Sequence, residues 1–239
     1  MNKYVFLAVF LCALASTNAK PSHDKEEGSD SPSATGESEF KKIAEQVNER
    51  YNTTVLLDIG ELINKVDEKC PNLEKQMDNV AEEIHNCIDD IELGNDTLCH
   101  AVQENFVTCF KPVAVLINSC MPEESKDLPF MLGKMVQGLI TQACHSTVEE
   151  ILEIFNPCIY EADTDTLPAC EEVETVVNEH KSKLPSKSLI CHTLPKERNC
   201  AKSMVEGTCK NPITKNTVIK FHDAVEHAIK EDCDALNKA

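Results

Sequence analysis

Residues 190–209 read ICHTLPKERNCAKSMVEGTC, and residues 98–120 read LCHAVQENFVTCFKPVAVLINSC. Each segment begins with an aliphatic residue followed by Cys-His, and each places two more cysteines at steps of nine to eleven residues. In both, a further cysteine follows the third one after 24 positions. The shared spacing predicts two copies of one structural unit.

The similarity extends to six cysteines per unit, and we assign the units to residues 40–145 and 146–239. The six cysteines cover 74 positions in the first unit and 75 in the second. One spacing breaks the match, because the second and third cysteines are 12 positions apart in the first unit and 21 in the second. We expect an insertion, SKLPSKS at residues 182–188, to account for this difference.

The cysteines favour disulfides over a metal site or a nucleophile. The chain has 13 cysteines, and Cys12 lies in the apolar core of an N-terminal signal segment. An even number then remains in an exported chain without any CxxC motif, which favours six bridges and no free thiol. The twelve are Cys70, Cys87, Cys99, Cys109, Cys120, Cys144, Cys158, Cys170, Cys191, Cys200, Cys209 and Cys233.

Helix geometry restricts how the cysteines can pair. If Cys109 and Cys120 share a helix, they lie about 16 Å apart along its axis, whereas a disulfide needs Cα atoms within about 7 Å. Each must therefore reach a neighbouring helix, and we expect the same connectivity in both units. The spacing itself leaves the pairing open.

The N-terminus predicts export and an acidic arm. Residues 1–19 have one lysine, an apolar core and a small-residue end, as in a signal peptide. Residues 20–39 carry six acidic residues and two lysines without a large aliphatic or aromatic side chain, which predicts disorder. No later stretch is apolar for long enough to span a membrane. The net charge of −18 argues against nucleic acid and anionic membrane surfaces as partners, because both would be repelled.

From residue 40 onward, apolar residues recur at steps of three and four, while strand-like alternation is scarce. This period is typical of amphipathic helices packed on a core. We therefore predict an all-α, disulfide-stapled helical bundle of two tandem repeats, preceded by the disordered arm.

Two kinds of surface or binding site are predicted. Asn52 and Asn95 each begin an Asn-x-Thr sequon, so we expect glycans there. The segment PFMLGKMVQGLI at residues 129–140 is rich in methionine and aliphatic residues. It is either plain core or the lining of an apolar ligand cavity between helices, formed by Phe130, Met131, Met135 and Leu139.

Other polar motifs point to no chemistry. His222-Asp223 is similar to the His-Asp pair of secreted phospholipases A2, but the chain lacks their calcium loop and flanking cysteines. Acidic residues cluster at Glu149-Glu150, Glu153 and Asp163-Asp165, but a calcium loop needs alternate acids with a central glycine. The segment EADTDTL at residues 161–167 lacks that glycine, and we interpret it as a linker between the units. We expect no catalytic residue, no metal and no cofactor.

The chain resembles the insect 27-kilodalton hemolymph glycoprotein family over about residues 45–239. The resemblance rests on KCPN at 69–72, FVTCFKP at 106–112, SCMPEESKDLP at 119–129 and the surrounding cysteines. It implies a secreted, extracellular glycoprotein of insect hemolymph without an assigned activity, and no catalytic residues.

Two functions follow from these observations. The first is a non-enzymatic carrier that binds a small apolar ligand between its helices. The alternative is a structural, storage or defence protein that acts through surface contacts with other hemolymph proteins.

Overall fold

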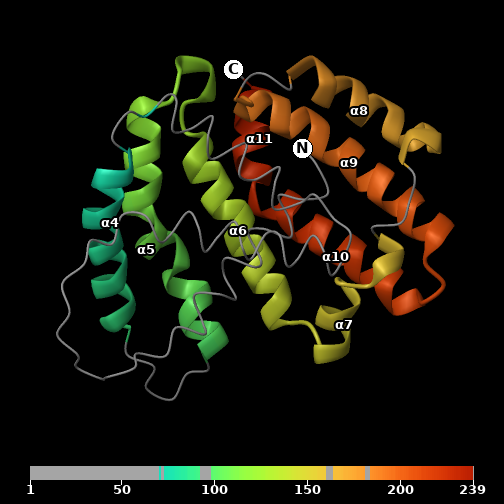
Figure 1. Cartoon of the computed structure of the whole chain (residues 1–239), viewed down its shortest axis with the longest axis horizontal. Coiled ribbons are helices and arrows are strands. Elements are labelled where there is room, and N and C mark those ends of the chain that lie inside the picture. Colours follow the sequence, from blue (N-terminus) through green and yellow to red (C-terminus); the bar gives the residue numbers. More distant parts are fainter. Residues whose placement is uncertain (1–69, 71–72, 92–97, 160–163, 181–183, 239) are drawn as a thin grey trace, which may run out of the picture. The chain divides into compact units, whose positions relative to one another are not determined.

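The computed structural model describes residues 70, 73–91, 98–159, 164–180 and 184–238. Within these ranges the regular structure is helical and no strand occurs, which confirms the all-α fold class (Figure 1). The α-helices are α4 (Leu73–Asp89), α5 (Leu98–Cys120), α6 (Leu128–Cys144), α7 (Val148–Glu153), α8 (Pro168–His180), α9 (Lys187–Thr208), α10 (Pro212–Ala228) and α11 (Lys230–Leu236). Short 3-10 turns lie at η2 (Glu123–Ser125), η3 (Pro157–Ile159) and η4 (Thr164–Thr166).

Several predictions made from the sequence lie outside the described residues. These are the signal peptide, the acidic arm and both glycosylation sequons, at Asn52 and Asn95. The described residues all belong to one compact unit of the chain. No helix among them has the length and apolar character needed to cross a bilayer.

Local sequence signals set where the helices begin. The Ser186 side chain accepts a hydrogen bond from the backbone N–H of Leu189, 3.1 Å away, and so caps the start of α9. Asn211 caps α10 in the same way, and Pro212 occupies the first turn, where its missing N–H costs no hydrogen bond. Thr147 and Glu150 form a reciprocal capping box at the start of α7.

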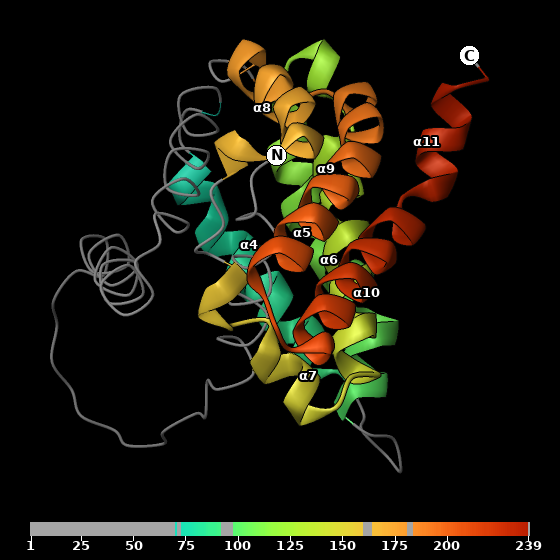
Figure 2. The ribbon, with the colours of Figure 1, turned by 90° about the vertical axis from the view of Figure 1, so that its right-hand side faces the viewer.

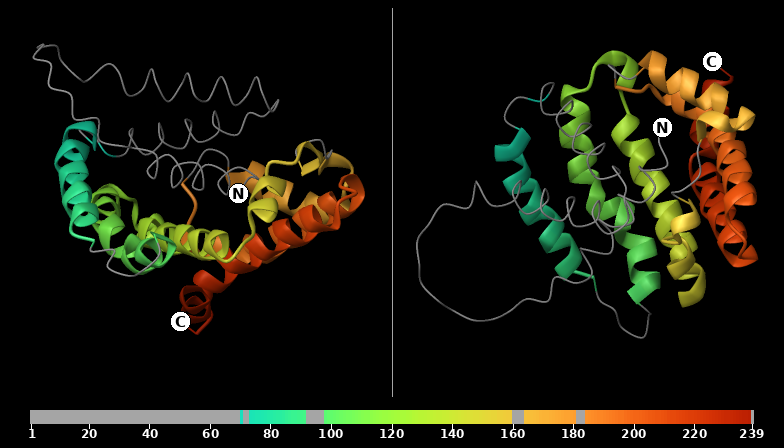
Figure 3. Two further views of the ribbon diagram at one scale, coloured as in Figure 1. Left: turned by 90° about the horizontal axis from the view of Figure 1, so that it is seen from below. Right: turned by 45° about the vertical axis from the view of Figure 1, so that its right-hand side comes forward.

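The helices pack in a symmetric order. Helix α4 packs on α5 and α5 on α6, while α8 packs on α9 and α9 on α10. The third helices of the two predicted repeats, α6 and α10, then pack against each other (Figures 1 and 3). The order of neighbours is therefore α4–α5–α6–α10–α9–α8.

Buried apolar side chains hold this arrangement together. In α10, Phe221 and Val225 are each 1% exposed, and in α9 Val205 is fully buried. Met204 and Val205 pack with Ile159 around the Cys158–Cys209 disulfide. Burying one large aliphatic or aromatic side chain stabilises the folded state by about 1.5–3 kcal/mol. The buried side chains and the disulfides therefore both contribute to the stability of the fold.

The twelve cysteines form six disulfides with Cα–Cα distances between 4.6 and 5.6 Å. In each half the first cysteine pairs with the fifth, the second with the fourth and the third with the sixth. The pairs are Cys70–Cys120, Cys87–Cys109 and Cys99–Cys144, then Cys158–Cys209, Cys170–Cys200 and Cys191–Cys233. The connectivity is the same in both halves, as the spacing predicted, while the duplication itself stays a prediction.

The expected insertion at residues 182–188 is not the reason for the unequal spacing. The connection between α8 and α9, residues 181–186, is shorter than the connection between α4 and α5, residues 90–97. Instead, ten helical residues follow Cys170 in α8, whereas only two follow Cys87 in α4. The second cysteine thus lies near the end of the first helix in one half and near its start in the other.

Candidate ligand groove

A break between α10 and α11 leaves a hollow beside α9. Helix α10 ends at Ala228 and α11 begins at Lys230, with Ile229 between them at φ −109° and ψ 6°. The chain changes direction at this point (Figure 2). Cys233 on α11 is joined to Cys191 on α9, with Cα atoms 5.4 Å apart. This disulfide fixes α11 beside α9 and so holds the hollow open.

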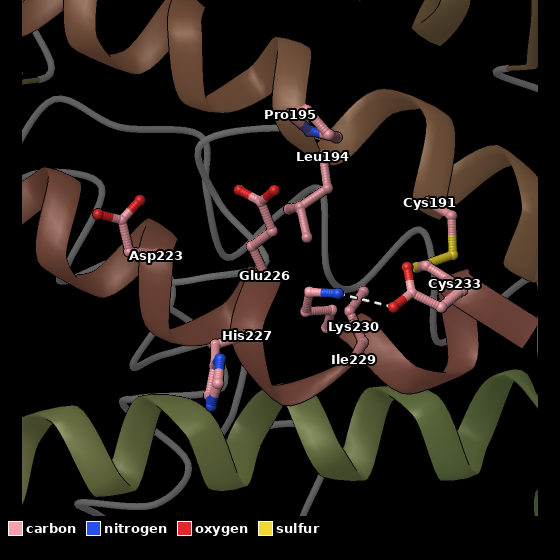
Figure 4. A pocket seen from close by; sticks show the side chains of 10 residues that line it. Cys191, Leu194, Pro195, Asp223, Glu226, His227, Ile229, Lys230 and Cys233 are labelled. Carbon is pink, nitrogen blue, oxygen red and sulfur yellow. Dashed lines mark hydrogen bonds and ion pairs between the residues drawn. A yellow bond between two sulfur atoms is a disulfide. The ribbon is translucent and has the colours of Figure 1, made fainter.

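The hollow is a groove of about 360 Å³ between α9, α10 and α11, hereafter the elbow groove. Its apolar part comes from Leu194, Pro195, Ile229 and the disulfide, and Leu194 and Ile229 are only 4% and 1% exposed (Figure 4). Its polar part comes from Asp223, Glu226, His227, Lys230 and Asp234. The groove therefore combines an apolar surface with ionisable groups, as small-molecule sites do.

Two carboxylates of the groove are engaged in ion pairs. Lys230 donates to Asp234 across 2.6 Å, and the pair lowers the pKa of Asp234 and raises the pKa of Lys230. Arg198 on α9 binds both carboxylate oxygens of Asp223, which raises the pKa of the guanidinium. This pair ties α9 to α10 at one end of the groove.

The third carboxylate differs from the other two. Among the residues that the structure describes, no hydrogen bond or ion pair engages the carboxylate of Glu226. Its side chain extends from α10 towards α9, beside Leu194 (Figure 4). The Arg198 guanidinium nevertheless acts on Glu226 through its charge, and Glu226 adds to the rise in the pKa of Arg198 that Asp223 mainly causes.

The first half of the chain has a hydrogen bond between helices at the matching position. Gln137 lies seven residues before the sixth cysteine of its half, as Glu226 does in the other half. The Gln137 amide donates a hydrogen bond to the backbone carbonyl of Gln103, 2.9 Å away, and so bridges α6 to α5. Pro195 occupies the register of Gln103, four residues after the third cysteine. An ionised Glu226 cannot donate such a bond, because a carboxylate only accepts.

No family model, curated protein or solved structure matches this chain. The elbow groove must therefore be interpreted from its own chemistry.

The residues predicted to line an apolar cavity lie elsewhere. Met131, Met135 and Leu139 are buried on α6, with exposures of 2%, 6% and 3%, and Phe130 is partly exposed. None of them lines the elbow groove. A ligand cavity at these four residues stays a prediction. The residues of the elbow groove were missed by the sequence analysis, although glutamine at 137 and glutamate at 226 stand at the same distance before the last cysteine of each half.

The acidic residues of α7 have a structural role. Glu150 accepts a hydrogen bond from Lys220 on α10, 2.6 Å away, and this bond together with the Thr147 cap lowers its pKa. Glu153 accepts from the buried Thr214 hydroxyl and from Asn156, and these bonds lower the pKa of Glu153. Both carboxylates anchor α7 on α10. Within the described ranges, no cluster of three or more His, Cys, Asp or Glu side chains is arranged to hold a metal.

The His222-Asp223 motif is also explained by packing. Burial lowers the pKa of His222 to about 4, with the Arg198 charge adding to the shift and Asp223 opposing it. His222 is therefore neutral at neutral pH, while Asp223 is held by Arg198. A neutral ring at the edge of the core fits the interpretation that we made from the sequence.

Proposed function

We propose that this chain is an exported, non-enzymatic binding protein that carries a small ligand in the elbow groove between α9, α10 and α11. The observation that carries the proposal is the groove itself, with a volume of about 360 Å³ and the buried side chains of Leu194 and Ile229 in its wall. Ligand sites of small molecules typically have volumes of about 300–1,000 Å³. The groove thus suits a small organic molecule with an apolar part.

The chemistry of the groove favours binding over catalysis. Its two cysteines, Cys191 and Cys233, are joined to each other and supply no thiolate nucleophile. Asp223 and Asp234 are engaged by Arg198 and Lys230. These groups support the shape of the groove.

The proposal places the protein in insect hemolymph as a secreted glycoprotein. Six disulfides are typical of proteins that mature in an oxidising compartment. The signal segment at residues 1–19 and the sequons at Asn52 and Asn95 support export and glycosylation. The resemblance to the hemolymph glycoproteins supports the same location.

A fluorescent probe tests the binding function. We expect N-phenyl-1-naphthylamine, a neutral apolar dye, to bind the full chain with a rise in fluorescence. A Pro195→Trp substitution places a large ring at the groove and should abolish binding, whereas Gln103→Trp, at the same register in the first half, should not. Absence of dye binding to the wild-type chain, or equal binding to both variants, contradicts the proposal.

One observation favours the alternative function through surface contacts. Val148 and Leu152, one turn apart on α7, are 75% and 65% exposed. Helix α7 is anchored on α10 by Glu150 and Glu153, so this apolar pair is presented on a fixed backbone. If the alternative holds, a Val148→Ser/Leu152→Ser variant should lose partners that the wild-type chain recovers from body fluid. Identical partner sets exclude this pair as the contact surface.

A further inference from the structure

We propose that the Cys191–Cys233 disulfide is a thiol-sensitive switch: its reduction by a small thiol compound detaches α11 and so removes one wall of the elbow groove. This inference rests on the proposed function, because it names how a ligand of the same groove is released. Detachment of α11 takes Lys230, Cys233 and Asp234 away from the lining of the groove.

The Cys191–Cys233 bridge is more accessible than four of the other bridges. Cys191 and Cys233 are both only partly buried, and both line the elbow groove (Figure 4). Each bridge between a first and a fifth or a second and a fourth cysteine contains one buried cysteine instead: Cys70, Cys109, Cys170 or Cys209. An attacking thiolate must reach a sulfur atom, so exposed disulfides are the more readily reduced ones. The groove therefore gives a small thiol a path to this bridge.

Apart from this disulfide, the described residues attach α11 only weakly. Within α11, all of which the structure describes, no side chain is buried. Lys134 on α6 forms an ion pair with Asp232 at 2.7 Å, but both side chains are partly exposed, and such ion pairs contribute little stability. A helix of seven residues is too short to be stable in water without packing. Opening of the disulfide should therefore detach or unfold α11.

The matching bridge of the first half, Cys99–Cys144, is also accessible but holds no separate helix. Cys99 is exposed and Cys144 is partly buried. Cys144 is the last residue of α6, a continuous helix whose Leu139 and Ile140 are buried and which packs along α5 and α10. Opening of this bridge should leave α6 in place. The break at Ile229 thus gives the second-half bridge a conformational consequence that the first-half bridge lacks.

Reduction of the bridge takes two thiol–disulfide exchanges. The thiolate of a small thiol attacks one cysteine sulfur and forms a mixed disulfide, and the other cysteine leaves as a thiolate. A second external thiolate then attacks the mixed disulfide, which releases the second cysteine and joins the two external sulfurs. The protons that the external thiols lose pass through the solvent to the two cysteines. One protein disulfide is thus reduced to two thiols, while two external thiols are oxidised to one disulfide.

Limited reduction of the wild-type chain tests the order of opening. We would treat the disulfide-intact chain with dithiothreitol, block free thiols with N-ethylmaleimide at successive times, and map the labelled cysteines by mass spectrometry. We expect labelling of Cys191 and Cys233 to be on the order of tenfold faster than labelling of Cys200 and its fully buried partner Cys170. Labelling of all twelve cysteines at one rate, or earlier labelling of Cys170 and Cys200, overturns the proposal.

Hydrogen exchange and dye release connect the opening to the groove. Once Cys191 and Cys233 are labelled, exchange over residues 230–236 should become faster, and bound N-phenyl-1-naphthylamine should be released. The control is Cys99→Ser/Cys144→Ser, in which the same treatment should still produce both effects. Exchange in α11 that stays slow after labelling of Cys191 and Cys233 shows that the bridge does not hold this helix, and it overturns the proposal.

The outcomes separate this switch from the binding function. If the dye binds and stays bound after Cys191 and Cys233 are labelled, the groove remains a binding site and the switch is wrong. If the dye fails to bind the oxidised chain, the binding function is overturned, and the order of labelling with the exchange of α11 still decides whether the bridge controls this helix.

Discussion

A Cβ atom placed on Gly138 of α6 would lie only 2.7 Å from the backbone carbonyl oxygen of Ala224 on α10. It would also lie 2.9 Å from the Cβ of Ala228. The third helices of the two halves therefore meet so closely at this point that only glycine fits without a shift. The joint between the halves depends on this contact.

Gly138→Ala should destabilise the fold. The added methyl meets backbone atoms that cannot rotate away, and such overpacking costs about 1–3 kcal/mol. Chemical denaturation with and without the substitution measures the loss. Gly207→Ala on α9 is the matched control, because no atom lies within 4 Å of its added Cβ. Gly207 lies in the last turn of α9, so alanine there should change the free energy of unfolding by less than about 0.5 kcal/mol. Equal effects at the two glycines would contradict the close contact.

Thr214→Val should weaken the attachment of α7 to α10. The fully buried hydroxyl of Thr214 donates to Glu153, and valine keeps the shape without the donor. We expect a loss of about 1–2 kcal/mol, together with a rise in the pKa of Glu153 measured by NMR. The control is Thr175→Val, an exposed threonine whose hydroxyl bonds to its own helix. It should change stability by less than about 0.5 kcal/mol.

Peptide mapping under non-reducing conditions should recover six cystine peptides. The expected pairs follow the order one to five, two to four and three to six in each half. No pair should join a cysteine before residue 145 to one after it. Unreduced protein should also show no titratable thiol from these twelve cysteines. A pair that crosses the halves would overturn the assigned connectivity.

The fold class was predictable because its signals are local and redundant. Apolar spacing alone marks α5 and α9 as helices, and a shared helix forbids a bridge between Cys109 and Cys120. Both cysteines indeed lie in α5 and pair with Cys87 and Cys70. The place of Cys170 within α8 was not predictable. The number of residues between two cysteines does not say whether those residues lie in a helix or in a connection.

The elbow groove was less accessible to sequence reasoning. Ile229 has the apolar character that the helical period requires, so the period continues through the break between α10 and α11. The setting of Glu226 depends on how α9 packs on α10, because the Arg198 guanidinium of α9 acts on it through its charge. In the sequence, the one sign of it is that glutamine at 137 and glutamate at 226 each stand seven residues before the last cysteine of their half. Three-dimensional contacts were needed to interpret that difference.

Removal of the Cys191–Cys233 disulfide should loosen α11 selectively. Helix α11 has seven residues and packs on α9 and α10, and Lys134 on α6 adds one ion pair to Asp232 at 2.7 Å. A Cys191→Ser/Cys233→Ser variant should lose about 2–4 kcal/mol of stability and show faster hydrogen exchange over residues 230–236. The equivalent variant in the first half, Cys99→Ser/Cys144→Ser, should leave exchange in that segment unchanged. Equal effects of the two variants on α11 would contradict a local role for the bridge.

Acid should destabilise the protein through His222 before most carboxylates titrate. Burial lowers the pKa of His222 to about 4 in the folded chain, against an ordinary value of 6.5. The unfolded chain therefore binds the proton more tightly, and the free energy of unfolding should fall as the pH drops from about 6.5 towards 4. The full difference corresponds to about 3 kcal/mol. Urea unfolding at half-unit pH steps measures this slope.

A His222→Asn variant provides the comparison for this pH dependence. Asparagine is polar and does not titrate, so the slope between pH 6.5 and 4 should become flatter than in the wild-type chain even if the overall stability changes. Because Glu150 and Glu153 have lowered pKa values, their contribution is lost only as the pH falls below about 4.5, and it should persist in the variant. A wild-type slope that survives in His222→Asn would show that another group binds the proton.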